Sequence, residues 1–222
     1  EVENKGVLDQ WCSMSEMQKR GYAALTFDSP DFRGIDVGIL YQKNAFTVVN
    51  SEIIRIDFPK EIVEDYTTRD MLIIEGKIQN LPVFIVVNHW PSRRGGLKKS
   101  EPKRTYVATQ LKKRTDQILT ENPEAKFIFM GDFNDETNNK SVAEILTENN
   151  ISFINMMSDL DAQDKGTYNY RGNWNMLDQI IVSKDIANGN VGWKATNPTI
   201  FQREWMMYQD KKYGATPNRT YG

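Results

Sequence analysis

The chain of 222 residues contains one cysteine, Cys12, and one histidine, His89. A lone cysteine excludes an intrachain disulfide, and a lone imidazole argues against a zinc site built on histidine and cysteine ligands. No apolar run approaches the length of a transmembrane helix. The net charge of −2 lacks the basic excess typical of proteins that bind nucleic acid non-specifically, although it is compatible with a local basic site.

Nothing in the sequence divides the chain, since it contains no long polar linker and no internal repeat. We therefore expect a single domain over residues 1–222. Hydrophobic residues make up 39% of the chain, with 5 Trp, 9 Tyr and 10 Phe, which is enough for a sizeable core. The compartment stays open, because a secreted or periplasmic protein loses its signal peptide on maturation. The sequence also gives no oligomeric state.

Apolar segments bounded by turn residues predict strands, and periodic apolar positions predict helices. The expected strands cover residues 22–27, 36–41, 46–56, 71–79, 81–88, 126–130 and 176–183. The expected helices cover residues 3–12, about 100–122 with Ser100 as the N-cap, and 141–147. The tail from Asn197 is aromatic, and we expect it to be irregular. Because several consecutive strands have no helix between them, the pattern predicts an α+β fold of mostly antiparallel sheets with helices outside.

Polar side chains follow two of the expected strands at the point where each strand ends. The apolar run Phe127–Met130 leads directly into Gly131, Asp132 and Asn134. The run 83–87 leads in the same way into Asn88 and His89. Such strand ends are where a rigid sheet presents functional groups. In isolation, however, the first segment also fits a simple Asx turn, and the second fits a structural histidine.

The residue types at these positions suit one kind of chemistry. Carboxylate and amide oxygens are hard ligands for Mg²⁺, Mn²⁺ or Ca²⁺. A hard cation, a histidine and a pair of arginines together favour hydrolysis at phosphorus, and we expect Arg93 to reach a phosphate. Asp178 lies in an apolar expected strand, where a buried carboxylate needs a partner. The basic run from Arg93 to Arg104 is otherwise typical of a solvated face.

Five segments, taken together and in order, resemble the endonuclease/exonuclease/phosphatase superfamily, whose fold is that of deoxyribonuclease I. They are Glu1–Asn4, Arg33–Ile39, Asn88–Arg93, Gly131–Asn134 and Met176–Ser183. The details at 88–96 (Asn-His-Trp and Arg-Arg-Gly-Gly) look most like bacterial members. The resemblance implies a four-layer α/β sandwich of two mostly antiparallel sheets with helices outside.

The resemblance also implies roles for individual residues. Glu1 would be the metal ligand for Mg²⁺ or Mn²⁺. Asp132 would orient or deprotonate the attacking water, and His89 and Asn134 would contact phosphoryl oxygens. Asp178 matches an aspartate that orients a second catalytic histidine in the family.

The family pattern includes a strand upstream of its metal-binding glutamate and a last strand that carries Ser-Asp-His. Neither occurs in these 222 residues, so Asp178 has no second histidine to orient here. We therefore expect the sequence to be part of a longer protein, truncated at both ends.

These observations predict a metal-dependent hydrolase of phosphate esters, either a phosphodiesterase (nuclease) or a phosphatase, that acts by in-line attack of water. The substrate stays open and includes nucleic acid and phospholipid head groups. The alternative is a non-catalytic module of the same fold that binds phosphate or nucleic acid. A purely structural domain is a third interpretation, and it requires the five segments to agree by chance.

Overall fold

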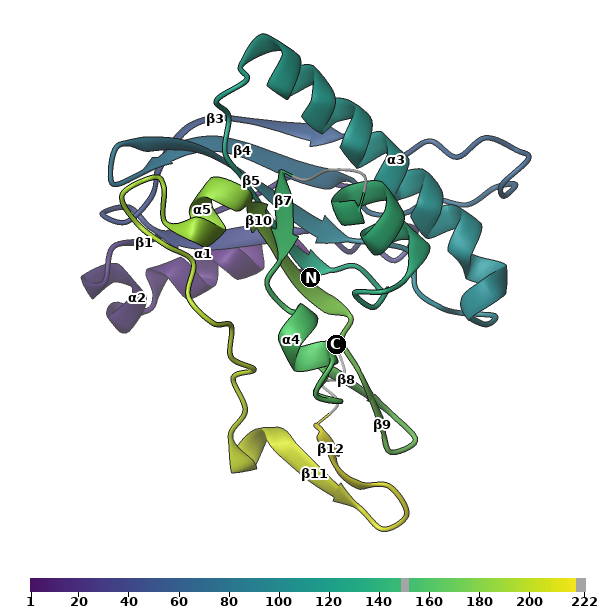
Figure 1. Cartoon of the computed structure of the whole chain (residues 1–222). Coiled ribbons are helices and arrows are strands. Elements are labelled where there is room, and N and C mark those ends of the chain that lie inside the picture. The colour runs from purple at the N-terminus through teal and green to yellow at the C-terminus, as the bar shows by residue number, and fades with distance from the viewer. Residues whose placement is uncertain (149–151, 219–222) are drawn as a thin grey trace.

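The computed structural model describes residues 1–148 and 152–218 and is built around one six-stranded sheet (Figure 1). The strand order is β3-β4-β5-β6-β10-β7. Neighbouring strands run antiparallel, apart from the parallel pair β5–β6. The strands are β3 (Thr47–Ile54), β4 (Met71–Ile78), β5 (Leu81–His89), β6 (Phe127–Asp132), β7 (Phe153–Asn155) and β10 (Asp178–Ser183).

Both faces of this sheet are covered, which explains why its central strands are continuously apolar. In β4, Met71 and Ile73 pack toward helices α3 (Leu97–Glu121) and η1 (Ser141–Glu148, a π-helix). Leu72 and Ile74 point the other way, because successive side chains of a strand alternate between faces.

The second face is covered by a small antiparallel sheet of β1 (Tyr22–Thr26) and β2 (Gly38–Gln42). Leu25 and Ile39 of this sheet join the same apolar cluster as Leu72. Helix α1 (Lys5–Ser13) packs outside β1. The order helix, small sheet, large sheet, helix confirms the expected four-layer α/β sandwich of two mostly antiparallel sheets.

The remaining elements are short, and β8–β9 and β11–β12 form two separate two-stranded sheets. They are α2 (Ser15–Lys19), α4 (Ser158–Asp161), β8 (Tyr168–Tyr170), β9 (Asn173–Asn175), α5 (Lys184–Asn188), the 3₁₀ turn η2 (Glu204–Met206), β11 (Met207–Asp210) and β12 (Gly214–Pro217). The hairpin β11–β12 projects away from the sandwich (Figure 1). Among the residues described, no helix is both long and apolar enough to cross a bilayer.

Two expectations about local structure are wrong. The long helix begins at Leu97, not after Ser100, because Gly96 with φ of 106° turns the chain and precedes the first helical residue. The Ser100 hydroxyl therefore bonds the carbonyls of Gly96 and Leu97 inside the first turns. The tail is also more regular than expected, since Asp210 accepts two backbone hydrogen bonds in the turn that closes β11–β12.

A buried polar cluster joins α3 to the chain that follows β6. The fully buried Arg104 lies with Nε 2.7 Å from Oδ1 of Asp135, and its Nη1 donates to Ser100 Oγ. The other carboxylate oxygen of Asp135 accepts from Ser141 Oγ at 2.5 Å, and the backbone carbonyl of Asp135 accepts from Gln179. The segment after β6 is thereby fixed to α3, η1 and β10.

We expect Asp135→Ala to destabilise the protein by about 3–5 kcal/mol, because it leaves the guanidinium of Arg104 buried without its counter-charge. Urea unfolding followed by tryptophan fluorescence measures this loss. The matched control is Asp116→Ala, which removes an exposed ion pair with Lys112 and should cost less than about 1 kcal/mol. Equal losses for the two variants would show that the buried pair does not hold this region together.

Candidate active site

Three predicted site residues lie side by side because of strand register. In the parallel pair β5–β6, His89 is opposite Asp132. In the antiparallel pair β6–β10, Asp178 is also opposite Asp132. Neighbouring strands are about 4.8 Å apart, so these side chains leave one end of the sheet as a row. The structure thus brings together residues that are far apart in the sequence.

The close approach of β5 and β6 at this end requires a glycine before Asp132. Gly131 has φ of 125°, a conformation that favours glycine, and a Cβ atom there would lie 2.0 Å from the carbonyl oxygen of Asn88. A side chain at position 131 would therefore force the two strands apart and displace His89 from Asp132.

The turn after β6 holds the carboxylate of Asp132 in place. The backbone N–H of Asn134 donates to Asp132 Oδ1 at 2.7 Å, and the Asn134 side-chain amide donates to Oδ2 at 3.1 Å and to the carbonyl of Trp90. The Asx-turn interpretation of this segment is therefore correct as local structure, and the same turn presents the carboxylate to the cavity. A contact between Asn134 and a phosphoryl oxygen stays a prediction.

His89 lies between two carboxylates. Its Nε2 is 3.6 Å from Asp132 Oδ2, and its Nδ1 is 3.9 Å from Glu1 Oε1. The side chain is only 12% exposed, and burial together with the positive charge of Arg69 lowers the pKa of His89 to about 3. The imidazole is thus neutral at physiological pH, and one of its nitrogens can donate a hydrogen bond while the other accepts.

The pKa of Asp132 is shifted in the opposite direction, upward from its ordinary value. Burial and the nearby charge of Asp178 raise the pKa of Asp132 to about 7, against the hydrogen bond from the Asn134 backbone. Asp178 itself was expected to be a buried carboxylate, and that expectation is wrong: it is the first residue of β10 and is exposed, and its N–H donates to Thr167 Oγ1. Its contribution here is therefore electrostatic and directed at Asp132.

A buried arginine and a buried aspartate complete the floor of the site, and the sequence interpretation missed both. Arg69 donates from Nη1 to Asp31 Oδ2 at 3.1 Å and from Nη2 to the carbonyl of Trp90 at 2.9 Å. Asp31 also accepts from Nε of Arg33 at 3.0 Å. Burial alone would raise the pKa of Asp31, but the hydrogen bonds from Arg33 and Arg69 outweigh it and lower that pKa. The site thus contains two fixed guanidinium groups.

Glu1 could hold a divalent cation, because its carboxylate lines the cavity beside His89. Within the described part of the chain it accepts no hydrogen bond, and its nearest charged neighbour is Arg33, with Nη2 at 3.9 Å from Oε1. The described residues contain no cluster of three or more metal-ligating His, Cys, Asp or Glu side chains. Mg²⁺ is commonly bound through one or two carboxylates, with water and substrate phosphate as the other ligands, so the donor set fits this ion.

Arg93 borders the same cavity, but its guanidinium is engaged by protein acceptors. Nε donates to the carbonyl of Asn134 at 2.8 Å, and the terminal nitrogens donate to Glu136, Asn139 and Asn175. In this arrangement Arg93 holds the turn after β6 against neighbouring loops. Its contact with a phosphate stays a prediction, whereas the positive charges of Arg69 and Arg33 both act on the pKa of His89.

The predicted site residues line one cavity of about 920 Å³ at the end of the large sheet. They are Glu1, His89, Arg93, Asp132, Asn134 and Asp178. Four further cationic side chains line the cavity, namely Arg33, Arg69, Arg94 and Lys103. A cavity with carboxylates at one place and fixed cations around it suits an anionic ligand together with a divalent cation.

The low pKa of His89 gives a spectroscopic prediction. His89 is the only histidine in the chain, so its imidazole signal needs no assignment. We expect the Cε1–Hε1 resonance of the metal-free protein to show no imidazole protonation shift from pH 8 to pH 5, because the folded state keeps the ring neutral down to a pKa of about 3. Only the smaller shift caused by the titration of the neighbouring Asp132 near pH 7 should be seen, and Asp132→Asn should abolish it. A full protonation shift with a midpoint near the ordinary value of 6.5, retained in Asp132→Asn, would contradict this description of the site.

The same shift makes stability depend on pH with a defined sign. Below pH 6.5 the unfolded chain takes up a proton on His89 that the folded protein binds only near pH 3, so the contribution of His89 to the free energy of unfolding falls across this interval. Asp132, with a folded pKa of about 7, contributes in the opposite direction. The variant His89→Gln removes only the first contribution, so the difference in the free energy of unfolding between wild type and variant should fall from pH 7 to pH 5.

Comparison with known proteins gives the same fold. Residues 1–222 match the family model described as the Endonuclease/Exonuclease/phosphatase family. None of the curated proteins matches the chain in sequence. Among solved structures, the catalytic domain of human Nocturnin is 18% identical, with 83% of this chain and 67% of that chain covered and a TM-score of 0.60.

Two further solved structures have similarly low sequence identity and comparable TM-scores. A truncated TDP2 from Caenorhabditis elegans is 21% identical, with 79% of this chain and 67% of that chain covered and a TM-score of 0.57. A mannosyl-6-phosphatase from Bacteroides thetaiotaomicron is 14% identical, with 76% and 66% covered and a TM-score of 0.53. The chain spans about two thirds of the length of each of these proteins. The structural likeness shows the fold, and because the family model matches every residue, the chain belongs to the endonuclease/exonuclease/phosphatase family.

Proposed function

We propose that the protein is a divalent-metal-dependent phosphoesterase that hydrolyses its substrate by in-line attack of water on phosphorus. The observation that carries the proposal is the register that sets His89 beside Asp132, with Glu1 on the other side of the imidazole. Within one cavity these groups supply a base, a hydrogen-bond donor and a metal ligand, which is the set that phosphoryl transfer to water needs.

Asp132 is the group we assign to the attacking water. Its pKa of about 7 lies near neutral pH, where a general base combines a useful ionised fraction with useful basicity. The two hydrogen bonds from Asn134 fix the carboxylate, so that it can orient water without first reorganising. Asp178 contributes by keeping the pKa of Asp132 high.

His89, Arg69 and Arg33 are the groups we assign to the phosphate. A neutral imidazole donates one hydrogen bond to a phosphoryl oxygen, and the two guanidinium groups supply positive charge as negative charge develops on these oxygens. Arg69 is held by Asp31 and by the Trp90 carbonyl, so its position does not depend on the substrate.

Glu1 would hold the metal, for which Mg²⁺ or Mn²⁺ fits the oxygen donors. When bound, such an ion neutralises phosphate charge and makes a bound water more acidic. The substrate is defined only as a phosphate ester, more broadly than the reaction is. One related structure is a mannosyl-6-phosphatase, and a zebrafish TDP2 structure contains a single-strand DNA product, so the phosphate ester is the feature these proteins share.

We expect Asp132→Asn to lower metal-dependent hydrolysis by at least about 100-fold, because an amide cannot accept a proton from water. The assay is a panel of phosphate monoesters and diesters, from plasmid DNA to phospholipids, with Mg²⁺ or Mn²⁺. Asp116→Asn, on the exposed face of α3, is the control and should keep full activity. Unchanged turnover by Asp132→Asn would contradict the mechanism. Phosphate and metal binding without any turnover by the wild type would favour the non-catalytic module.

The metal assignment has a readout that does not depend on activity. We expect Glu1→Gln to weaken Mn²⁺ binding by at least roughly tenfold in isothermal titration calorimetry, because an amide is a poorer ligand than a carboxylate. Glu3→Gln, two residues away, is the control and should bind Mn²⁺ like the wild type. Unaltered affinity in Glu1→Gln would show that the ion is held elsewhere.

A further inference from the structure

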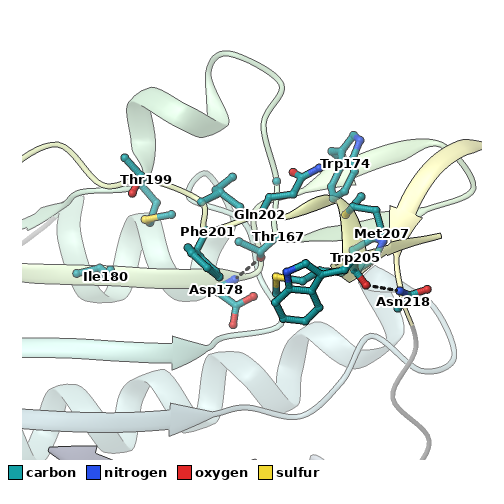
Figure 2. Close-up of a pocket in the computed structure, with 15 residues that line it drawn as sticks. Thr167, Trp174, Asp178, Ile180, Thr199, Phe201, Gln202, Trp205, Met207 and Asn218 are labelled. Atoms are coloured by element: carbon teal, nitrogen blue, oxygen red, sulfur yellow. Dashed lines mark hydrogen bonds between the residues drawn. The ribbon is translucent and has the colours of Figure 1, made fainter. Parts of the chain in front are cut away.

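A second cavity, of about 630 Å³, shares the residues Thr167 and Asp178 with the wall of the proposed active site. Figure 2 shows the side chains that line it. Its walls come from the start of β10, from the β8–β9 region and from the segment that leads into β11. The residues that line it are mostly apolar and include Thr167, Asp178, Phe201, Trp205 and three methionines, Met157, Met206 and Met207. This volume lies within the range of about 300–1,000 Å³ typical of small-molecule sites.

The two cavities adjoin each other. Thr167 and Asp178 line both of them, and the Asp178 N–H donates to Thr167 Oγ1 at 3.1 Å. Asp178 is also opposite Asp132 in the sheet. A molecule whose phosphate lies near Asp132 can therefore extend the rest of its structure past Asp178 into the second cavity.

The charges in the two cavities differ. The active-site cavity has several cationic side chains in its wall, including Arg33 and Arg69. In the second cavity, Asp178 is the only ionisable side chain among the described lining residues. Because Asp178 lines both cavities, the difference comes from the cationic side chains, which attract an anionic phosphate to the first cavity. A neutral apolar group is favoured in the second cavity, where the wall is mostly apolar.

Two aromatic side chains of the second cavity are exposed, and hydrogen bonds fix the backbone at one of them, Trp205. Trp205 is 76% exposed and Phe201 is 64% exposed. The carbonyl of Trp205 nevertheless accepts a hydrogen bond from the Asn218 side chain at 3.0 Å, and the Asn218 N–H donates to the carbonyl of Met206 at 2.8 Å. In Figure 2, Phe201 and Trp205 flank Asp178. Exposed aromatic groups on a fixed backbone around a cavity are typical of a ligand site.

We propose that the second cavity binds the organic group esterified to the phosphate, and that this group is a planar, largely apolar ring system. The inference rests on the proposed function, because it takes the neighbouring cavity as the phosphate site. Rings stack well against tryptophan and phenylalanine. The hydroxyl groups of a bare sugar would instead lose their hydrogen bonds to water against this wall.

Two phosphate esters with the same phosphate and different alcohols test the proposal. Naphthyl phosphate and methyl phosphate are compared as monoesters, and dinaphthyl and dimethyl phosphate as diesters. We expect Trp205→Ala and Phe201→Ala to lower kcat/KM for the naphthyl esters by roughly three- to tenfold, mainly through KM, with little change for the methyl esters. Tyr208→Ala is the matched control, since Tyr208 is 54% exposed in β11 and does not line the cavity.

A binding measurement separates this proposal from the proposed function. Methionine methyl groups labelled with ¹³C report on the cavity through Met157, Met206 and Met207. In the inactive variant Asp132→Asn, naphthyl phosphate should shift these signals and methyl phosphate should not. The additional change Trp205→Ala should reduce the shifts.

The outcomes are distinct. Absence of hydrolysis by the wild type overturns the proposed function. The methionine shifts then show, independently of activity, whether the second cavity binds the aromatic group. The aromatic-group proposal is overturned if Trp205→Ala and Phe201→Ala change kcat/KM equally for naphthyl and methyl esters. It is also overturned if naphthyl phosphate leaves the methionine signals unshifted. A dimer in sedimentation that Trp205→Ala dissociates also overturns it, because the aromatic wall would then be covered by a second copy of the chain.

Discussion

The parallel pairing of β5 with β6 is the constraint on which the site depends. It places His89 opposite Asp132, and it requires a crossover between two strands of one sheet. Helix α3 is that crossover, and its apolar side covers one face of the sheet. The same connection therefore builds the core and sets the distance between imidazole and carboxylate. Gly131 permits the close approach, since a Cβ atom there would meet the Asn88 carbonyl.

Buried polar contacts keep the end of this sheet in one arrangement. The Arg104–Asp135 ion pair fixes the chain directly after the turn that follows β6, and Arg93 donates a hydrogen bond to the Asn134 carbonyl within that turn. On the other side, Arg69 is held by Asp31 and by a backbone carbonyl. The ionisable groups that face the cavity are thereby held in place, so their unusual pKa values arise from a fixed environment.

Much of the fold and of the candidate site could be predicted from the sequence, for identifiable reasons. The apolar strand before Gly131 and its abrupt polar end were visible as local patterns, and so was His89 after a second such strand. The pair Asp31–Arg69 was not, because the two residues are 38 positions apart and their contact depends on tertiary packing. The exposure of Asp178 was missed for a related reason, since periodicity does not show which end of a strand meets solvent.

The central claim is that Glu1 holds a single divalent ion beside the lone imidazole, in the cavity that His89 and Asp132 line. Paramagnetic broadening by Mn²⁺ tests it most directly, because the single histidine provides one unambiguous signal close to the expected position of the ion. The account predicts that substoichiometric Mn²⁺ selectively broadens the Cε1–Hε1 resonance of His89 and that excess Mg²⁺ restores it. A His89 signal that stays sharp while Mn²⁺ is bound would contradict the account.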